Sequence, residues 1–137
     1  MSEIILIVDD NPDTREIITR TLSKIGYECE TADNGAQALE RVAARRPGLI
    51  ITDLMMPKVN GFTLLTMLQR DAATARIPII LVSGVASPQM ELLPGVTKVI
   101  IKGALDLAEL RAEVQRILPL EAAEGGSPGE TAGQAGR

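Results

Sequence analysis

Short apolar runs alternate along the chain with longer segments in which apolar residues recur at helical spacing. Most of the runs are continuous rather than alternately polar, which is typical of parallel strands covered on both faces. The run at residues 28–32 is more polar, and we expect it at an edge of the sheet. The predicted strands are residues 4–8, 28–32, 49–52, 77–82 and 96–101.

The segments between these strands carry signals of helix starts and ends. Asn11 followed by Pro12 is typical of a helix start, and Gly26 of a helix end. Asp106, with Glu109 three residues later, has the spacing of a capping box before the last helix. The predicted helices are residues 12–25, 36–46, 61–69 and 107–118, with at most two turns at residues 88–93.

This order of elements predicts an α/β domain with a doubly wound sheet of five parallel strands and helices on both faces. The working site of such folds lies at the carboxyl ends of the strands. Four predicted strands end there in residues that can carry chemistry. Asp9 and Asp10 follow the first strand, Asp53 the third, Ser83 the fourth and Lys102 the fifth.

Three carboxylates at one edge of a sheet repel one another unless they recruit cations or raise their own pKa values. Magnesium suits such a site, because it prefers one or two carboxylates together with water and phosphate oxygens. Asp53 can act as a nucleophile that accepts a phosphoryl group. Lys102 offers a mobile positive charge for a phosphate oxygen, and Ser83 a short hydrogen-bond donor. The sequence therefore predicts a site that holds a phosphoryl group on Asp53 beside magnesium.

Composition removes several other classes of site. The chain has 137 residues, a net charge of −4, no His and one Cys. A His base, a His-ligated metal, an intrachain disulfide and a thiolate zinc site are therefore excluded. The acidic balance and the presence of only two aromatic rings argue against a nucleic-acid-binding surface. Of these rings, we expect Tyr27 to be partly exposed and Phe62 to lie in the core at the start of the third helix.

The chain changes character near Pro119. Residues 119–137 are rich in Gly, Ala, Pro and Glu, so we expect a domain at residues 1–118 and a flexible tail at 119–137. The tail is too short for a DNA-binding module, which predicts a stand-alone domain without DNA binding. No apolar stretch reaches the length of a membrane span, so we expect a cytoplasmic protein that does not bind membranes.

The residues at the strand ends and their flanking sequences resemble the receiver domain of two-component response regulators. The resemblance spans about residues 3–118 and includes the segments ILIVDDNPDTRE, DNGAQALE and DLMMPKVNGFTLL. It implies a flavodoxin-like strand order of 2-1-3-4-5. It also implies phosphoryl transfer to Asp53 from the phosphohistidine of a sensor histidine kinase or phosphotransfer protein, with magnesium required.

The same resemblance assigns roles to the residues of the site. Asp9, Asp10, Asp53 and the backbone carbonyl of Met55 would hold the metal. By the same match, Ser83 and Lys102 would contact the phosphoryl oxygens. Output would come from binding an unknown downstream protein or from passing the phosphoryl group on. Receivers often pair through the face formed by their fourth and fifth helices, so the resemblance leaves both a homodimer and a monomer open.

Three features depart from the family pattern. Val99 occupies the position where receivers usually carry Tyr or Phe, so the usual switching ring is absent. Gly103 replaces the Pro that usually follows the Lys in a cis bond, and we expect a trans bond here because a non-Pro cis bond costs about 2.5–4 kcal/mol. The segment between Ser83 and Lys102 is shorter than usual, which predicts a short or irregular fourth helix.

Other interpretations stay open at this point. Asp9 and Asp10 could be helix caps, Ser83 a loop hydroxyl and Lys102 a solvated charge. At the level of function, the leading interpretation is a phosphorylatable receiver that is not an enzyme, except that it assists its own phosphorylation and dephosphorylation.

The alternative is a degenerate receiver that acts as an interaction module without phosphorylation. A magnesium phosphatase with an aspartyl intermediate fits poorly, because Met55 stands where such enzymes usually carry a second Asp. Met55 and Val85 are both apolar, which predicts slow self-dephosphorylation.

Overall fold

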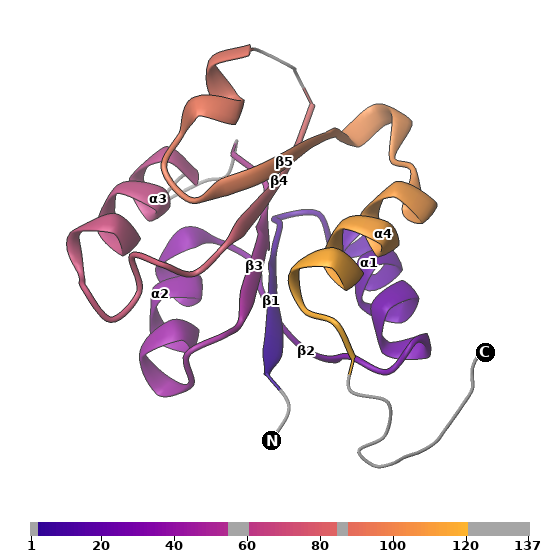
Figure 1. The fold of residues 1–137 in the computed structure, drawn as a ribbon, viewed down its shortest axis with the longest axis horizontal. Helices are drawn as coiled ribbons and strands as arrows, with labels where there is room; N and C mark the ends of the chain where they lie inside the picture. The colour runs from indigo at the N-terminus through magenta and orange to yellow at the C-terminus, as the bar shows by residue number, and fades with distance from the viewer. Residues whose placement is uncertain (1–2, 55–60, 85–87, 121–137) are drawn as a thin grey trace.

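The computed structural model describes residues 3–54, 61–84 and 88–120, so Met55, Val85 and most of the predicted tail lie outside the described residues. The described residues form a five-stranded parallel sheet of order β2-β1-β3-β4-β5, with helices on both faces (Figure 1). The predicted fold class and strand order are confirmed. The elements are β1 (Ile4–Val8), α1 (Pro12–Lys24), β2 (Glu28–Ala32), α2 (Gly35–Ala44), β3 (Leu49–Thr52), α3 (Gly61–Arg70), β4 (Ile79–Ser83), the 3₁₀ helix η1 (Pro88–Leu92), β5 (Val96–Ile101), the 3₁₀ helix η2 (Lys102–Ala104) and α4 (Leu107–Ile117).

Strand β1 lies between β2 and β3 in the sheet, and all five of its residues are buried. Successive side chains of a strand point to opposite faces of the sheet. Ile5 and Ile7 belong to the core on the face covered by α1 and α4, whereas Leu6 and Val8 belong to the core on the α2 and α3 face (Figure 1). A continuous apolar run is therefore needed to fill both cores.

The strand register places the carboxyl ends of neighbouring strands at the same level. Val8, at the end of β1, pairs with Ala32 of β2 on one side and Thr52 of β3 on the other. Ser83, at the end of β4, pairs with Ile101 of β5. The residues that follow these positions are thereby brought to one edge of the sheet, as the sequence predicts.

Side-chain caps define the predicted helix starts. The Asn11 side chain accepts hydrogen bonds from the backbone N–H groups of residues 13 and 14, and Pro12 opens α1. The Asp106 side chain accepts in the same way from residues 108 and 109 at the start of α4. The second half of the predicted capping box is replaced by an ion pair, since Glu109 Oε2 lies 2.9 Å from Lys98 Nζ.

The segment between β4 and β5 carries the short, irregular element that the sequence predicts. The η1 helix is a 3₁₀ helix of five residues in place of a full α-helix. Among the described peptide bonds, which include the bond from Lys102 to Gly103, all are trans, as expected. Strand β4 begins two residues later than predicted, because the Ile77 N–H still donates to the Thr74 carbonyl in the preceding turn.

The outer strands of the sheet are more polar than the inner ones. Glu28, at the start of β2, forms a bidentate ion pair with Arg45, with N–O distances of 2.9 and 3.1 Å. On the opposite edge, Lys98 of β5 forms its pair with Glu109. The prediction that residues 28–32 form an edge strand is confirmed.

Two predictions about aromatic rings are wrong. Phe62 is 47% exposed, because α3 turns Leu64, Leu65 and Leu68 toward the core instead. Tyr27 is only 7% exposed and packs in the core between the sheet and the α1 and α4 helices. Its hydroxyl donates a 2.6 Å hydrogen bond to the Leu118 carbonyl at the end of α4.

The helices of the described part of the chain are all too short or too polar to cross a lipid bilayer.

Candidate functional site

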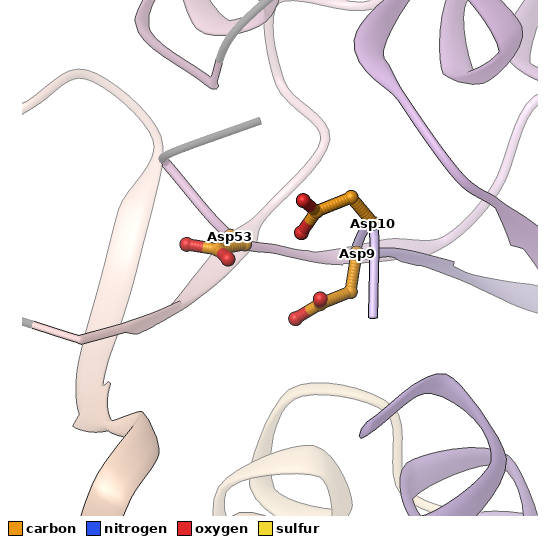
Figure 2. Close-up of side chains that lie close together, drawn as sticks. All are labelled: Asp9, Asp10 and Asp53. Carbon is orange, nitrogen blue, oxygen red and sulfur yellow. The ribbon is translucent and has the colours of Figure 1, made fainter. Parts of the chain in front are cut away.

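Three carboxylates meet at the carboxyl edge of the sheet. Asp9 and Asp10 follow β1, and Asp53 follows β3; one carboxylate oxygen from each lies within 4.8 Å of the others (Figure 2). Asp9 is 1% exposed and Asp53 is 4% exposed, whereas Asp10 is open to solvent. The predicted triplet is therefore brought together, with two members buried and one accessible.

The backbone and side chain of Asp9 are held by several elements. Its N–H donates to the Ala32 carbonyl at the end of β2 over 3.1 Å. Its Oδ1 accepts from the Asn11 N–H at 2.8 Å, and its carbonyl accepts from Arg15 Nη1 at 2.6 Å. Asp53 is anchored to β1 in turn, since its N–H donates to the Val8 carbonyl over 3.0 Å.

Lys102 joins the two buried carboxylates. Its Nζ lies 3.0 Å from Asp9 Oδ1 and 3.0 Å from Asp53 Oδ2. Lys102 follows β5 directly and begins η2, so the end of the edge strand delivers the ammonium group to the site. The structure thus places Lys102 among the carboxylates rather than on the open surface, although Gly103 follows it.

The electrostatics of this cluster are set by burial and by charge pairing. Burial raises the pKa of the Asp9 carboxyl, while the Asn11 N–H and Lys102 act in the opposite direction. Burial by itself lowers the pKa of Lys102, but Asp53 and Asp9 outweigh it, so the pKa of the ammonium is raised. Lys102 therefore stays charged at neutral pH and offsets part of the repulsion between the carboxylates.

Ser83 and Val99 belong to β4 and β5, the two strands beyond β3 in the sheet. Ser83 is fully buried at the end of β4 and is in register with Ile101, the residue before Lys102. This register brings Ser83 to the same end of the sheet as the carboxylates. Val99 is half-buried and packs against the core on the α2 and α3 face.

The donor set suits a hard divalent cation. The ligand atoms that converge are carboxylate oxygens, without sulfur or imidazole nitrogen, and magnesium prefers such oxygen ligands. Asp9, Asp10 and Asp53 could hold the ion, and the exposure of Asp10 leaves room for water and phosphate oxygens. The backbone carbonyl of Met55, a further predicted ligand, lies outside the described residues.

Sequence reasoning missed two residues that shape this site. Arg15 contacts the Asp9 carbonyl, and the only signal was its place in the first turns of the helix that follows the two aspartates. Gly61, at the start of α3, packs directly behind Asp53: a Cβ there would lie 2.7 Å from the Asp53 carbonyl oxygen and 2.6 Å from Leu54 Cα. A glycine at a helix start carries no such information by itself.

Comparison with known proteins agrees with this geometry. The family model of the response regulator receiver domain matches residues 5–115. A gliding motility regulatory protein of Myxococcus xanthus is 34% identical over 116 residues, which cover 82% of this chain and 15% of that protein. This chain thus spans a small part of that relative's length.

Solved structures show the same fold. The chemotaxis protein CheY4 of Vibrio cholerae is 30% identical, with a TM-score of 0.78 over 86% of this chain and 100% of that one. The response regulator TrrA of Thermotoga maritima, solved in complex with Mg²⁺-BeF, is 28% identical, with a TM-score of 0.74 over 85% of this chain and 99% of that one. The family match, the fold and the carboxylate cluster agree, and the chain belongs to the response regulator receiver domain family.

Proposed function

We propose that Asp53 accepts a phosphoryl group from a phosphohistidine of a sensor histidine kinase or phosphotransfer protein, in a reaction that requires magnesium. The observation that carries this proposal is the convergence of three carboxylates within 4.8 Å, two of them bridged by Lys102. Receiver domains are signalling domains rather than a classical enzyme family, so the protein is a phosphoacceptor that assists its own modification.

The residues of the site divide the chemistry among them. A carboxylate oxygen of Asp53 attacks phosphorus, the phosphorus–nitrogen bond breaks, and the imidazole leaves with the electron pair and takes up a proton. When bound by Asp9, Asp10 and Asp53, magnesium would supply positive charge that offsets the negative charge of the phosphoryl oxygens.

Two further side chains would receive the transferred group. Lys102 lies 3.0 Å from the attacking carboxylate, and its ammonium group would contact a phosphoryl oxygen as a point charge. Ser83, at the end of β4, would donate a hydrogen bond to a second phosphoryl oxygen. The backbone bond from the Asp53 N–H to Val8 holds the nucleophile in place during the transfer.

The direct test is incubation with a small-molecule phosphodonor and magnesium, followed by mass spectrometry of the intact protein. We expect the mass gain of one phosphoryl group, which disappears when magnesium is chelated or when Asp53 is changed to Asn. Asp71→Asn is the matched control, because Asp71 is exposed just after α3 and only caps a local turn. Absence of any mass gain in the wild type, or a gain that persists in Asp53→Asn, would contradict the proposal.

We propose that output depends on a partner protein, by binding it or by passing the phosphoryl group to it. The competing function is an interaction module that ignores phosphorylation, and Val99 together with the short η1 helix favours it. The switch and the interaction module are distinguished by a binding experiment with a partner protein recovered from the cells that produce this chain. Equal affinity of the wild type and Asp53→Asn in the presence of phosphodonor supports the module; a difference supports the switch.

A further inference from the structure

We infer that Arg15 is a positioning residue that orients the peptide between Asp9 and Asp10 and thereby prepares the magnesium site. The inference rests on the proposed metal site and names a residue outside its ligands. The contact that carries it is the 2.6 Å hydrogen bond from Arg15 Nη1 to the Asp9 carbonyl oxygen, made across six positions of sequence.

The two aspartates differ in how they are held. Asp9 is buried, and its N–H, carbonyl and carboxylate all accept or donate hydrogen bonds within the domain. Asp10 is exposed, and its side chain leaves the backbone on the side opposite to that of Asp9 before both turn toward Asp53 (Figure 2). The direction of the Asp10 carboxylate therefore depends on the backbone that carries it.

Peptide geometry transmits the Arg15 contact to Asp10. The carbonyl of Asp9 and the N–H and Cα of Asp10 lie in one planar peptide unit. A donor that fixes the Asp9 carbonyl oxygen also fixes the orientation of this plane and the position from which the Asp10 side chain starts. Residues that hydrogen-bond to metal-ligating residues orient those ligands, and their mutation typically weakens metal binding by about 10–100-fold.

Helix α1 holds Arg15 in place for this task. The Arg15 N–H donates to the Asn11 carbonyl over 3.1 Å, so Arg15 belongs to the turn that Asn11 caps. Its half-buried side chain forms one wall of a groove of about 330 Å³ along α1, and Thr31 of β2 contributes to the same groove. The Arg15 side chain thus reaches from α1 to the residue that follows β1.

A purely electrostatic role for Arg15 predicts the opposite sign of effect. A cation close to three carboxylates repels magnesium, so its removal by itself would strengthen metal binding. Loss of a positioning contact instead leaves Asp10 less well directed and weakens metal binding. The direction of the change therefore distinguishes the two roles.

The experiment is titration of the full chain with magnesium in a calorimeter, for the wild type, Arg15→Met and Arg15→Lys. We expect Arg15→Met to bind magnesium about tenfold more weakly, at the lower end of the range for outer partners of metal ligands. Arg15→Lys keeps the charge and one donor but loses the planar fork, so we expect an intermediate affinity. The backbone amide of Asp10, followed by NMR without metal, should shift in Arg15→Met.

Arg20→Met is the matched control. Arg20 lines the same groove of α1, but its guanidinium pairs with Glu16 at 2.7 Å on the exposed surface. We expect Arg20→Met to bind magnesium as the wild type does and to leave the Asp10 amide signal in place. Equal weakening in Arg15→Met and Arg20→Met would overturn the inference, and so would unchanged or tighter binding in Arg15→Met.

The outcomes also separate this inference from the proposed function. If the wild type itself does not bind magnesium, the proposed site fails. If the wild type binds magnesium and Arg15→Met binds it equally well, only the role of Arg15 fails. Should Arg15→Met not fold, as judged by circular dichroism, Arg15→Lys decides: weaker binding than the wild type supports the inference, and equal binding overturns it.

Discussion

The two halves of the site edge are built differently. At the ends of β1 and β3, Asp9 and Asp53 are buried. The Asp9 N–H donates to β2, the Asp9 carbonyl accepts from the Arg15 side chain of α1, and the Asp53 N–H donates to β1. Between β4 and β5, the described part of the connection contains the five-residue 3₁₀ helix η1, and Leu92 in it is 81% exposed; the pairing of the two strands shifts register at the start of β4, between Ile79 and Ile80. The two buried aspartates are thus held by hydrogen bonds that involve three neighbouring elements, whereas the described connection from β4 to β5 is short and largely exposed.

In the proposed function, this difference would separate the phosphoryl-transfer chemistry from the output. Phosphoryl transfer needs carboxylates held in a defined geometry, and the β1–β3 half supplies that geometry. In that proposal, Val99 and the short η1 helix belong to the β4–β5 half and would shape the output. Lys102 is the exception, because it belongs to the β5 end of the chain but contacts the β1 and β3 aspartates.

The largest expected effect follows from adding a methyl group behind Asp53. In Gly61→Ala, the new Cβ would lie within 3 Å of the backbone of Asp53 and Leu54. We expect a loss of about 3 kcal/mol of unfolding free energy, the upper range for overpacking, measured by urea denaturation. Gly84→Ala, where no atom of the described residues lies within 4 Å of the new Cβ, is the control on the other half and should change little. Equal costs would erase the contrast between the halves.

The next effect concerns the cation that links the two halves. Lys102→Met leaves the buried Asp9 and Asp53 without their shared ammonium, and we expect a loss of about 2 kcal/mol in metal-free buffer, as for hydrogen bonds to charged groups. Added magnesium should reduce this loss, because it replaces the missing charge. Lys98→Met, in the strand that precedes Lys102, removes a solvent-exposed ion pair and should cost less stability than Lys102→Met. If both variants lose the same stability, Lys102 does not specifically stabilise the two buried aspartates.

Tyr27 offers a reference at the opposite end of the sheet. Tyr27→Phe keeps the buried ring and removes its bond to Leu118, so we expect a loss of about 1 kcal/mol. Burial raises the pKa of Tyr27 above the ordinary value of about 10. The unfolded chain then loses the phenol proton before the folded one, so stability should fall as pH rises above about 10.

The chain has one Tyr and no Trp, so tyrosinate absorbance reports this group alone. Its midpoint should lie higher in the folded protein than in denaturant, and coincident midpoints would contradict the assignment.

The smallest effect is expected at the surface of η1. Leu92→Gln replaces a side chain that is 81% exposed, so we expect a change in unfolding free energy of less than about 0.5 kcal/mol. Met90→Ala, in the same helix but 8% exposed, should cost several times more, since it empties part of the core. A large loss in Leu92→Gln would show that this half of the edge is more firmly packed than its contacts indicate.

The helices and strands could be predicted because their sequence signals are local. The site could be predicted because the strand topology alone brings its residues together. Continuous apolar runs identified the buried strands, and parallel pairing was enough to gather Asp9, Asp53 and Lys102 at one edge. The exposure of Phe62 and the burial of Tyr27 could not be predicted, because the rotation of a helix about its axis and the docking of α4 depend on distant packing. The contacts of Arg15 and Gly61 could not be predicted either, because they too depend on how distant segments pack.

The ion pairs on the two outer strands have a consequence for the behaviour of the protein in concentrated solution. The inner strands are Ile- and Leu-rich runs that would readily template further strands if the sheet could grow. Growth would have to proceed through β2 or β5, where Glu28 is paired with Arg45 and Lys98 with Glu109. A second copy that adds to either edge must disrupt or desolvate these charges, so the same pairs that contribute little to folding stability act against aggregation.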